Sequence, residues 1–249
     1  MIELGNNKLY LGDCLDIMKD IADKSIDMIL CDLPYNITLL DWDNEIPLDI
    51  LWKQYDRIIK DNGNIVLFSK QPFTTILNDS NLEDFRYELI WCKQQATNPL
   101  CAEIRIMPIH ENISVFYKQF GIYNPQMVYG RKLYQHFTGN NTIGEVYDNL
   151  QSKHRACTDG SRYPTSVLFF NNSREGFHPT QKPVALCEYL IKTYTNENMV
   201  VLDNCMGSGT TGVACVKTKR KFIGIEKEEK YFNIAKQRIE EELKQGELF

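Results

Sequence analysis

Residues 200–215 read VVLDNCMGSGTTGVAC, and this stretch decides the fold. Its opening apolar run predicts a short buried strand that ends at Asp203. A glycine-rich turn follows, and a helix is predicted to begin at Thr210 or Thr211. Glycines allow a sharp turn and close approach to a ligand, and the start of a helix offers unpaired N–H groups. The stretch therefore indicates a ligand site at the tip of a strand.

The next predicted strand, 222–226, ends at Glu226, where an acid is suited to accept hydrogen bonds from ribose hydroxyls. Gly207, Gly209 and Gly212 also satisfy G-x-G-x-x-G, so a dinucleotide is a rival ligand. Only one strand follows the turn, however, whereas a dinucleotide site needs a second mononucleotide-binding half. Asp203 would also place negative charge beside a pyrophosphate. A single nucleoside with a cationic, amino-acid end suits this acid better.

Strands and helices alternate on both sides of this stretch. Strands are predicted at 8–13, 27–31, 64–68, 87–91, 113–118, 199–203 and 222–226, and helices at 14–22, 47–63, 72–79, 183–195, after 209, and at 228–243. This alternation predicts an α/β fold with a doubly wound, mostly parallel, Rossmann-like sheet and helices on both faces.

The alternation stops between 119 and 176, where Tyr, Asn, Gly and Arg dominate without a sustained period. We expect an irregular insertion there, between two halves of one core, 1–118 and 177–249. The net charge of the chain is −5, yet residues 118–182 carry +4 and the remainder carries −9. A basic, loop-rich segment can bind a polyanion, although a solvated surface loop has the same composition.

Cysteine usage and hydropathy bound the class of protein. The eight cysteines stand singly, without a C-x-x-C pair, and the chain has four histidines. This spacing favours reduced structural cysteines over a disulfide framework or a zinc site, and we predict no metal. No stretch approaches eighteen apolar residues, and the first residues lack the pattern of a signal peptide. We therefore expect a cytoplasmic protein that has no membrane partner.

A second strand tip carries a reactive group. The run LCDLPYN, residues 30–36, places Asp32 where the strand 27–31 leaves the sheet, and Leu33, Pro34 and Tyr35 follow it. Pro34 restricts Leu33 to an extended conformation, so the turn is rigid. A carboxylate, a rigid turn and an aromatic ring are thus predicted to lie together at the edge of the sheet.

Taken in order, these motifs resemble those of the S-adenosylmethionine-dependent amino-methyltransferases that act on DNA. In the beta arrangement of that family a D-P-P-Y turn comes first, a target-recognition region lies in the middle and an F-x-G-x-G motif comes last. The corresponding segments here are DLPY (32–35), the insertion (119–176) and DNCMGSGTT (203–211). HPTQKP (178–183) and HENISVFYK (110–118) resemble two further family segments. The resemblance covers nearly the whole chain.

The resemblance implies a cofactor, partners and roles for residues. The cofactor would be S-adenosylmethionine, the product S-adenosylhomocysteine, and the partners double-stranded DNA and a cognate restriction endonuclease, with the enzyme a monomer or homodimer. Asp32 and the main-chain carbonyl of Leu33 would accept the two amino hydrogens of a flipped base, Pro34 would shape the turn, and Tyr35 would stack on the base. The implied cofactor-binding residues are Asp13, Gln181, Lys182, Pro183, Asp203, Gly207, Gly209, Thr210, Thr211 and Glu226. The implied DNA-binding residues are Trp42, Arg131, Lys132, Lys153, Arg155, Arg162 and Arg174.

Within this set Glu226 would hold the ribose, and Lys182 would pair with the cofactor carboxylate. Asp rather than Ser at position 32 resembles the adenine-modifying members. Cytosine-amino methylation, methylation of RNA or of a protein amide, and a non-catalytic DNA-binding relative remain alternatives. Two departures from the family pattern are Leu33, in place of proline, and Asn204-Cys205, in place of Pro-Phe. Because the second departure removes a ring that would pack on the adenine of the cofactor, we expect weaker cofactor binding.

Overall fold

The computed structural model describes residues 1–35, 46–96, 102–130, 160–172 and 181–246. The chain divides into two compact units, of which the larger is Met1–Asn124 with Ser166–Phe249 and the smaller is Pro125–Thr165. The described part of the smaller unit contains an antiparallel bridge between Val128 and Arg162, with N–H···O distances of 2.9 and 2.8 Å. This unit lies within the predicted insertion 119–176, whose role in target recognition stays a prediction.

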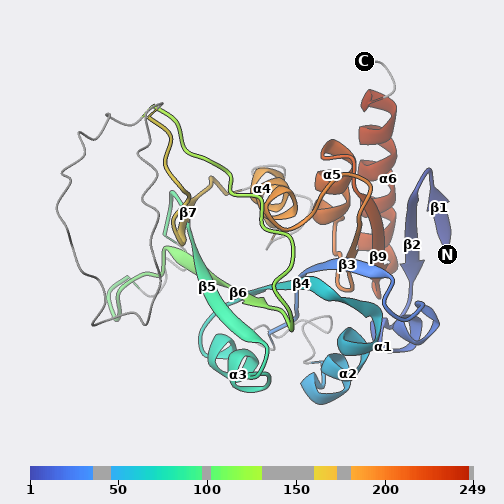
Figure 1. The fold of residues 1–249 in the computed structure, drawn as a ribbon, viewed down its shortest axis with the longest axis horizontal. Coiled ribbons are helices and arrows are strands. Elements are labelled where there is room, and N and C mark those ends of the chain that lie inside the picture. Colours follow the sequence, from blue (N-terminus) through green and yellow to red (C-terminus); the bar gives the residue numbers. More distant parts are fainter. Residues whose placement is uncertain (36–45, 97–101, 131–159, 173–180, 247–249) are drawn as a thin grey trace. The chain divides into compact units, whose positions relative to one another are not determined.

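One mixed sheet forms the centre of the larger unit (Figure 1). Within the described ranges it has nine strands, in the order β1-β2-β9-β8-β3-β4-β6-β5-β7. Their bounds are β1 Ile2–Leu4, β2 Asn7–Leu11, β3 Ile26–Asp32, β4 Ile59–Ser69, β5 Phe85–Cys92, β6 His110–Phe116, β7 Val167–Phe169, β8 Val200–Asp203 and β9 Lys221–Glu226. The pairs β2·β9, β9·β8, β8·β3, β3·β4 and β5·β7 are parallel, so the predicted mostly parallel α/β sheet is confirmed.

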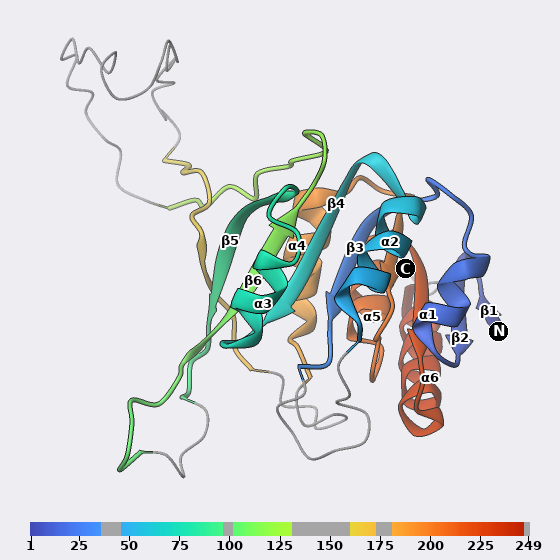
Figure 2. The same cartoon turned by 90° about the horizontal axis from the view of Figure 1, so that it is seen from below.

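Helices cover both faces of this sheet, and each face has its own apolar core. Their bounds are α1 Cys14–Ile17, α2 Leu48–Ile58, α3 Phe73–Asp79, α4 Val184–Tyr194, α5 Thr210–Lys217 and α6 Glu229–Gly246, with a 3₁₀ turn at Met18–Asp20. Helices α4, α5 and α6 pack on one face, and α1, α2 and α3 on the other (Figure 1). Figure 2 shows β5, β6, β4 and β3 side by side, with α2 and α3 in front of this part of the sheet and α1 near β2.

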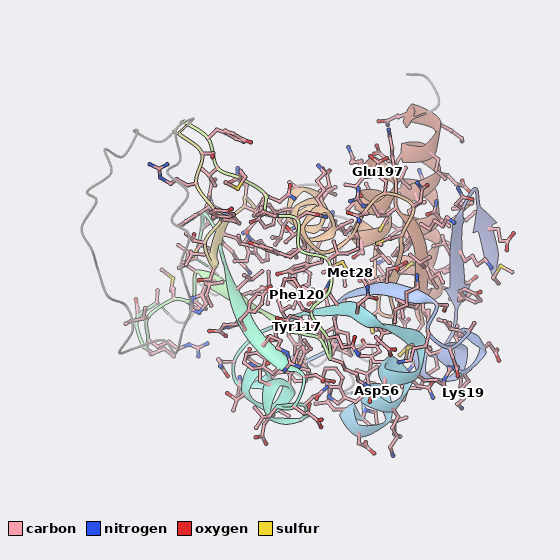
Figure 3. The ribbon with its side chains drawn as sticks, in the orientation of Figure 1. Lys19, Met28, Asp56, Tyr117, Phe120 and Glu197 are labelled. Atoms are coloured by element: carbon pink, nitrogen blue, oxygen red, sulfur yellow. The ribbon has the colours of Figure 1, made fainter. Side chains whose placement is uncertain are left out.

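Strand β3 illustrates why these residues form the middle of the sheet. Met28 and Leu30 contribute to the core under α4–α6, whereas Ile29 and Cys31 contribute to the core under α1–α3. All four are fully buried, because a strand turns alternate side chains to opposite faces and both faces are covered. Met28 accordingly lies inside the molecule, while Lys19 and Glu197 lie at its periphery (Figure 3).

The connections change direction between β3 and β8. From β8 the chain passes through α5 to β9, and from β3 it passes through α2 to β4, which lies on the other side. The two crossover helices lie on opposite faces, so their loops diverge and leave a crevice at the carboxyl ends of β3 and β8. Such a switch point is where open α/β sheets bind ligands. Asp32 ends β3 and Asp203 ends β8, so both acids lie beside this crevice.

Three local predictions were wrong. The helix predicted to run to Gly63 ends at Ile58, because Ile59 pairs with Ile26 of β3 and is buried, which overrides the helical spacing. The helix predicted at 14–22 is α1 followed by the 3₁₀ turn. Strand β7, within the stretch predicted to be irregular, pairs with β5 and buries Leu168, but three residues are too few to show a period.

Candidate active site

A cavity of about 390 Å³ lies at the carboxyl ends of β3, β8 and β9. Three separate stretches of chain contribute most of its wall: residues 12–15 before and in α1, residues 32–35 after β3, and residues 203–208 after β8. Gln181, Lys182, Thr210, Thr211 and Glu226 also line it. The structure therefore brings the predicted catalytic turn and most of the predicted cofactor-binding residues to one cavity.

Asp203 is buried at the tip of β8 and is held by its own turn. Its carboxylate accepts hydrogen bonds from the Thr211 hydroxyl at 2.6 Å and from the Cys205 N–H at 3.1 Å. Burial raises the pKa of Asp203 to about 7, although these hydrogen bonds oppose the change. The acid is thus half-protonated near neutral pH, and a cation in the cavity would favour its ionised form.

Glu226 is fixed beside the same turn. Its two carboxylate oxygens accept the N–H groups of Gly207 and Glu228, each at 2.8 Å. Burial raises the pKa of Glu226 above its ordinary value, against the effect of these bonds. Asp13 lines the neighbouring wall, where its side chain accepts the N–H of Leu15 at 2.8 Å and caps α1. These contacts preorganise two carboxylates on the adjacent tips of β2 and β9.

The glycines of the turn have different tasks. Gly207 has φ +51°, lines the cavity, and a Cβ added there would meet nothing within 4 Å. Gly209 has φ +78°, and its Cβ would lie 2.7 Å from the Cβ of Ala235 in α6. Gly212 similarly faces Ile239 and Phe222. We expected Gly209 to border the cofactor, but it is not among the residues that line this cavity, and its contact with α6 explains the glycine.

Replacement of Gly209 should lower the stability of the protein more than replacement of Gly207. Gly209→Ala should cost about 3 kcal/mol of unfolding free energy, because the side chain adds a left-handed strain and overlaps Ala235. Gly207→Ala carries only the strain of about 1 kcal/mol, and its methyl group lies in the cavity wall. Urea denaturation should therefore distinguish the variants. Equal losses of stability in both would contradict the packing role assigned to Gly209.

Asp32 and the residues after it form the opposite wall. Asp32 accepts a hydrogen bond from the Tyr35 hydroxyl on one oxygen and pairs with the Lys182 ammonium through the other. Burial and the adjacent Asp32 carboxylate raise the pKa of Tyr35 well above its ordinary value, so its hydroxyl stays protonated and donates. The Tyr35 ring packs on Phe73 with 5.2 Å between centroids, and Leu33 is buried in the core. The turn is therefore anchored on both sides of Pro34.

Lys182 belongs to a buried chain of charges. Its ammonium lies 3.4 Å from one oxygen of Glu111, and the other oxygen of Glu111 pairs with Lys93 at 2.5 Å. Burial disfavours the charged form of Lys182, but the carboxylates of Asp32 and Glu111 more than offset this and raise its pKa. Burial likewise acts to raise the pKa of Glu111, yet the Lys182 and Lys93 ammonium groups hold it below its ordinary value. Both shifts favour the charged forms of Lys182 and Glu111, so this pair is ionised at neutral pH.

Loss of Glu111 should be costly because two buried ammonium groups share it. Glu111→Gln is expected to lower the unfolding free energy by about 3 kcal/mol, since breaking a buried pair leaves an uncompensated charge. Glu188→Gln is the matched control, because Glu188 pairs with Lys192 in an exposed i,i+4 contact worth about 0.5 kcal/mol. Chemical denaturation of the two variants measures both values. Similar, small losses of unfolding free energy in both variants would show that the ion pairs of Glu111 with Lys93 and Lys182 do not stabilise the fold.

Other predicted residues lie elsewhere. Pro183 precedes α4 and is not among the residues that line the cavity. Arg162 lies in the smaller unit, where its guanidinium donates to the Ser161 carbonyl at 2.7 Å. The remaining predicted DNA contacts lie outside the described residues: Trp42, Arg131, Lys132, Lys153, Arg155 and Arg174.

Several supporting residues escaped prediction. Arg238 of α6 donates to the Ser208 carbonyl at 2.6 Å and holds the glycine-rich turn. The hydroxyl of Tyr55, in α2, donates to Asn204 at 2.5 Å. Lys93 pairs with Glu111, and only Glu111 had a signal, because it lies in the HENISVFYK segment. A lone arginine, tyrosine or lysine in a helix or strand end has no local pattern that reveals such a contact.

Comparison with known proteins identifies the family. The N6/N4 DNA methylase family matches residues 26–237, which is most of the chain. The chain belongs to this DNA methylase family. A type II methyltransferase of Moraxella bovis, M2.MboI, is 28% identical over 95% of the chain and 88% of its own length.

Solved structures agree with the family and with the fold. The structure of the M1.HpyAVI complex with S-adenosylmethionine is 25% identical, with a TM-score of 0.64 over 93% of this chain and 98% of that one. PvuII DNA methyltransferase, described as cytosine-N4-specific, has a TM-score of 0.69 at 17% identity over 97% of this chain and 91% of that chain, and shows the fold alone. The predicted methyltransferase fold is confirmed.

The methylase is a DNA amino-methyltransferase, and S-adenosylmethionine is its methyl donor. The cavity suits such a group, because its volume is within the range of small-molecule sites and Gly207 leaves its wall open. Buried carboxylates at the tips of β8 and β9 offer acceptors for amino and hydroxyl donors. No helix in the described ranges is both long and apolar enough to cross a bilayer.

Proposed function

We propose that this methylase transfers a methyl group to the exocyclic amino group of adenine in double-stranded DNA. The supporting observation is that Asp32 and Asp203 end neighbouring parallel strands and line one cavity. A catalytic carboxylate and a cofactor-binding carboxylate then share one crevice. The order of the motifs along the chain, with 32–35 first and 203–211 last, supports the beta arrangement of the family.

The cofactor is held by the β8 and β9 side of the cavity in this proposal. Asp203 accepts the cationic amino group, Glu226 accepts the ribose hydroxyls, and Gly207, Thr210 and Thr211 border the methionine part. Gln181 and Lys182 close the cavity from the side of α4, and Asp13 borders the adenine. When bound, S-adenosylmethionine supplies an electrophilic methyl group. Amino-group methylation needs no covalent enzyme intermediate.

Asp32 prepares the target amine. One of its oxygens accepts an amino N–H, and the main-chain carbonyl of Leu33 accepts the other, so the nitrogen lone pair turns toward the methyl group. Each carboxylate oxygen has more than one acceptor site, so Asp32 can keep its contacts with Tyr35 and Lys182. The amine becomes acidic only as the methyl group is transferred, so Asp32 takes its proton late.

Lys182 links the two halves of the proposed site. Its ammonium pairs with Asp32 in this structure, whereas the family resemblance suggests a partner in the cofactor carboxylate. Glu111 and Lys93 lie behind it and hold its position. We therefore assign Lys182 to positioning Asp32 and to receiving the cofactor carboxylate when that group is present.

The target base must leave the duplex to reach Asp32. Tyr35, whose ring is oriented by Phe73, stacks on the flipped base in this proposal. Contacts to the duplex come from the basic insertion and from Trp42, while a cognate endonuclease is the expected functional partner. Asp at position 32 favours adenine, while cytosine remains the second candidate because the family comprises N6 and N4 methylases.

Labelled methyl transfer tests the function and the base together. Purified protein is incubated with labelled S-adenosylmethionine and either duplex DNA or RNA, and the products are digested to nucleosides. We expect label in N6-methyldeoxyadenosine from duplex DNA and none in RNA. Label in N4-methyldeoxycytidine would overturn the choice of adenine, and label in RNA alone would overturn the choice of DNA.

A further inference from the structure

Three cysteines that are far apart in the sequence meet beside the cavity. Cys14 begins α1, Cys31 lies in β3, and Cys205 follows Asp203 in the glycine-rich turn. Cys14 and Cys31 belong to one buried cluster, Cys205 packs against it, and the three thiols are near enough to influence one another's pKa. All three are free cysteines, and among the described residues no cluster has the makings of a metal site. Their proximity therefore calls for an explanation other than a metal.

Access separates the three thiols. Cys14 and Cys205 line the cavity, whereas Cys31 has no exposed surface and is not among the lining residues. The amide of Asn204, itself anchored by Tyr55, donates to the Cys205 sulfur at 3.5 Å. Asn204-Cys205 is the pair that replaces the Pro-Phe expected from the family pattern. This departure thus belongs to a polar network that ends in two thiols on the cavity wall.

The pKa values of the three thiols are shifted in different directions. The hydrogen bond from Cys205, together with one from Asn204, lowers the pKa of Cys14. Hydrogen bonds with Cys14 and Cys31, with burial, raise the pKa of Cys205 well above its ordinary value, and burial raises that of Cys31 to about 12. Because the thiolate is the reactive form, the lowered pKa favours Cys14 over Cys205 as the attacking thiol.

We propose that Cys14 and Cys205 form an oxidation-sensitive thiol pair in the wall of the cofactor cavity, and that peroxide closes it to a disulfide that prevents cofactor binding. The Cys14 thiolate attacks one peroxide oxygen, which gives a sulfenic acid and releases the other oxygen as water after protonation. The Cys205 sulfur then attacks the Cys14 sulfur, and a second water leaves. Two thiols are oxidised and one peroxide is reduced to two waters.

The disulfide should prevent binding because it joins two separate stretches of the wall, residues 12–15 and residues 203–208. Cys205 lies between Asp203, which accepts its N–H, and Gly207, whose N–H is held by Glu226. A bond to Cys14 would pull this turn toward residues 13–15 and disturb both carboxylates. Linkage requires the reverse effect as well, so a bound cofactor should protect the pair. The inference rests on the proposed position of the cofactor in this cavity.

The test uses the full-length protein, hydrogen peroxide and S-adenosylhomocysteine. After peroxide treatment, remaining thiols are alkylated under denaturing conditions and the peptides are identified by mass spectrometry. We expect a peptide that links Cys14 to Cys205, loss of the thermal stabilisation by S-adenosylhomocysteine, and recovery of both after dithiothreitol. S-adenosylhomocysteine at about ten times its Kd should slow the reaction about tenfold, because only the free fraction reacts.

Serine variants assign the effect. In Cys14→Ser and Cys205→Ser, whatever their affinity, peroxide should no longer change the stabilisation by S-adenosylhomocysteine. Cys92→Ser is the control and should stay sensitive, because Cys92 is half-buried at the end of β5 and outside the cavity wall. The proposal would be overturned if Cys14 and Cys205 remained reduced under conditions that oxidise Cys92. A disulfide between Cys31 and Cys205 would also overturn it. So would a Cys14–Cys205 bond that leaves binding intact.

Failure of this inference can be told apart from failure of the proposed site. Asp203→Asn tests the position of the cofactor without involving a thiol. If that variant loses affinity for S-adenosylhomocysteine while the wild-type thiols resist peroxide, the thiol proposal alone is wrong. If the disulfide forms but neither it nor Asp203→Asn alters binding, the cofactor lies elsewhere and both proposals fall.

Discussion

Asp32→Ala should lower the rate of methyl transfer to DNA by about a thousandfold while cofactor binding is retained. The alanine removes the acceptor that orients the amine and later takes its proton, but it leaves the β8 and β9 side of the cavity unchanged. Lys182 keeps Glu111 as a partner, so the variant is expected to fold. Single-turnover transfer of labelled methyl groups measures the loss. Thermal stabilisation by S-adenosylhomocysteine measures binding.

Asp49→Ala is the matched control, since Asp49 is an exposed acid on α2 with only a distant contact to Lys53. It should transfer methyl groups at the wild-type rate. If the methyl-transfer rate of Asp32→Ala stayed within about tenfold of the wild-type rate, Asp32 would have no catalytic role. Loss of S-adenosylhomocysteine binding in the same variant would mean instead that the turn at 32–35 holds the cofactor.

Asp203→Asn should weaken binding of S-adenosylhomocysteine by about a hundredfold, because a charged hydrogen bond to the amino group of the ligand is lost. The affinity of this variant for S-adenosylhomocysteine should also lose the pH dependence that is expected of the wild type. The folded-state pKa of Asp203 is raised to about 7 by burial, so below that pH the free protein holds a proton that a bound cation would expel. Wild-type affinity should therefore rise roughly tenfold between about pH 6 and about pH 7.5.

The same raised pKa has a consequence for folding. An unfolded aspartate ionises near pH 4, so between about pH 4 and about pH 7 the folded protein binds the extra proton, and its stability falls as pH rises through this window. Asp203→Asn should remove this part of the pH dependence. Urea denaturation at several pH values provides the measurement, with exposed Asp16→Asn as the control variant.

Calorimetric titration of S-adenosylhomocysteine in two buffers of different ionisation enthalpy counts the protons released on binding. We expect about one proton from the wild type near pH 6 and almost none from Asp203→Asn. Wild-type affinity that is flat across this range would show that no cation lies beside Asp203. An Asn variant that binds as tightly as the wild type would move the amino group of the cofactor to another part of the cavity.

Much of the fold could be predicted because its signals are local. The run VVLDNCMGSGTTGVAC contains a strand, a turn and the start of a helix within sixteen residues, and β8 and α5 formed as expected. Errors arose where a distant partner decided the outcome. Ile59 follows a helical pattern, yet it pairs with Ile26 and begins β4. Strand β7 depends on β5 for its pairing and has no period of its own.

The site was predictable to the same extent. Asp32, Asp203 and Glu226 could be placed at strand tips, and parallel strands bring their tips to one edge. The packing of Gly209 on α6 could not be predicted, because the same residue type serves either a ligand or a neighbouring helix, and only the position of Ala235 reveals the contact. Glu111 could be located by its motif, but its two lysine partners could not.

The sequence by itself determined the α/β class, the two reactive strand tips and the order of the motifs, because each depends on residues adjacent along the chain. Only the tertiary structure decided which groups meet. Lys182 reaches Asp32 across 150 positions, and Tyr55 reaches Asn204 across 149. Cys14, Cys31 and Cys205 come together for the same reason. Such contacts follow from the order of strands in the sheet and from which helix covers which face, and no local pattern encodes either.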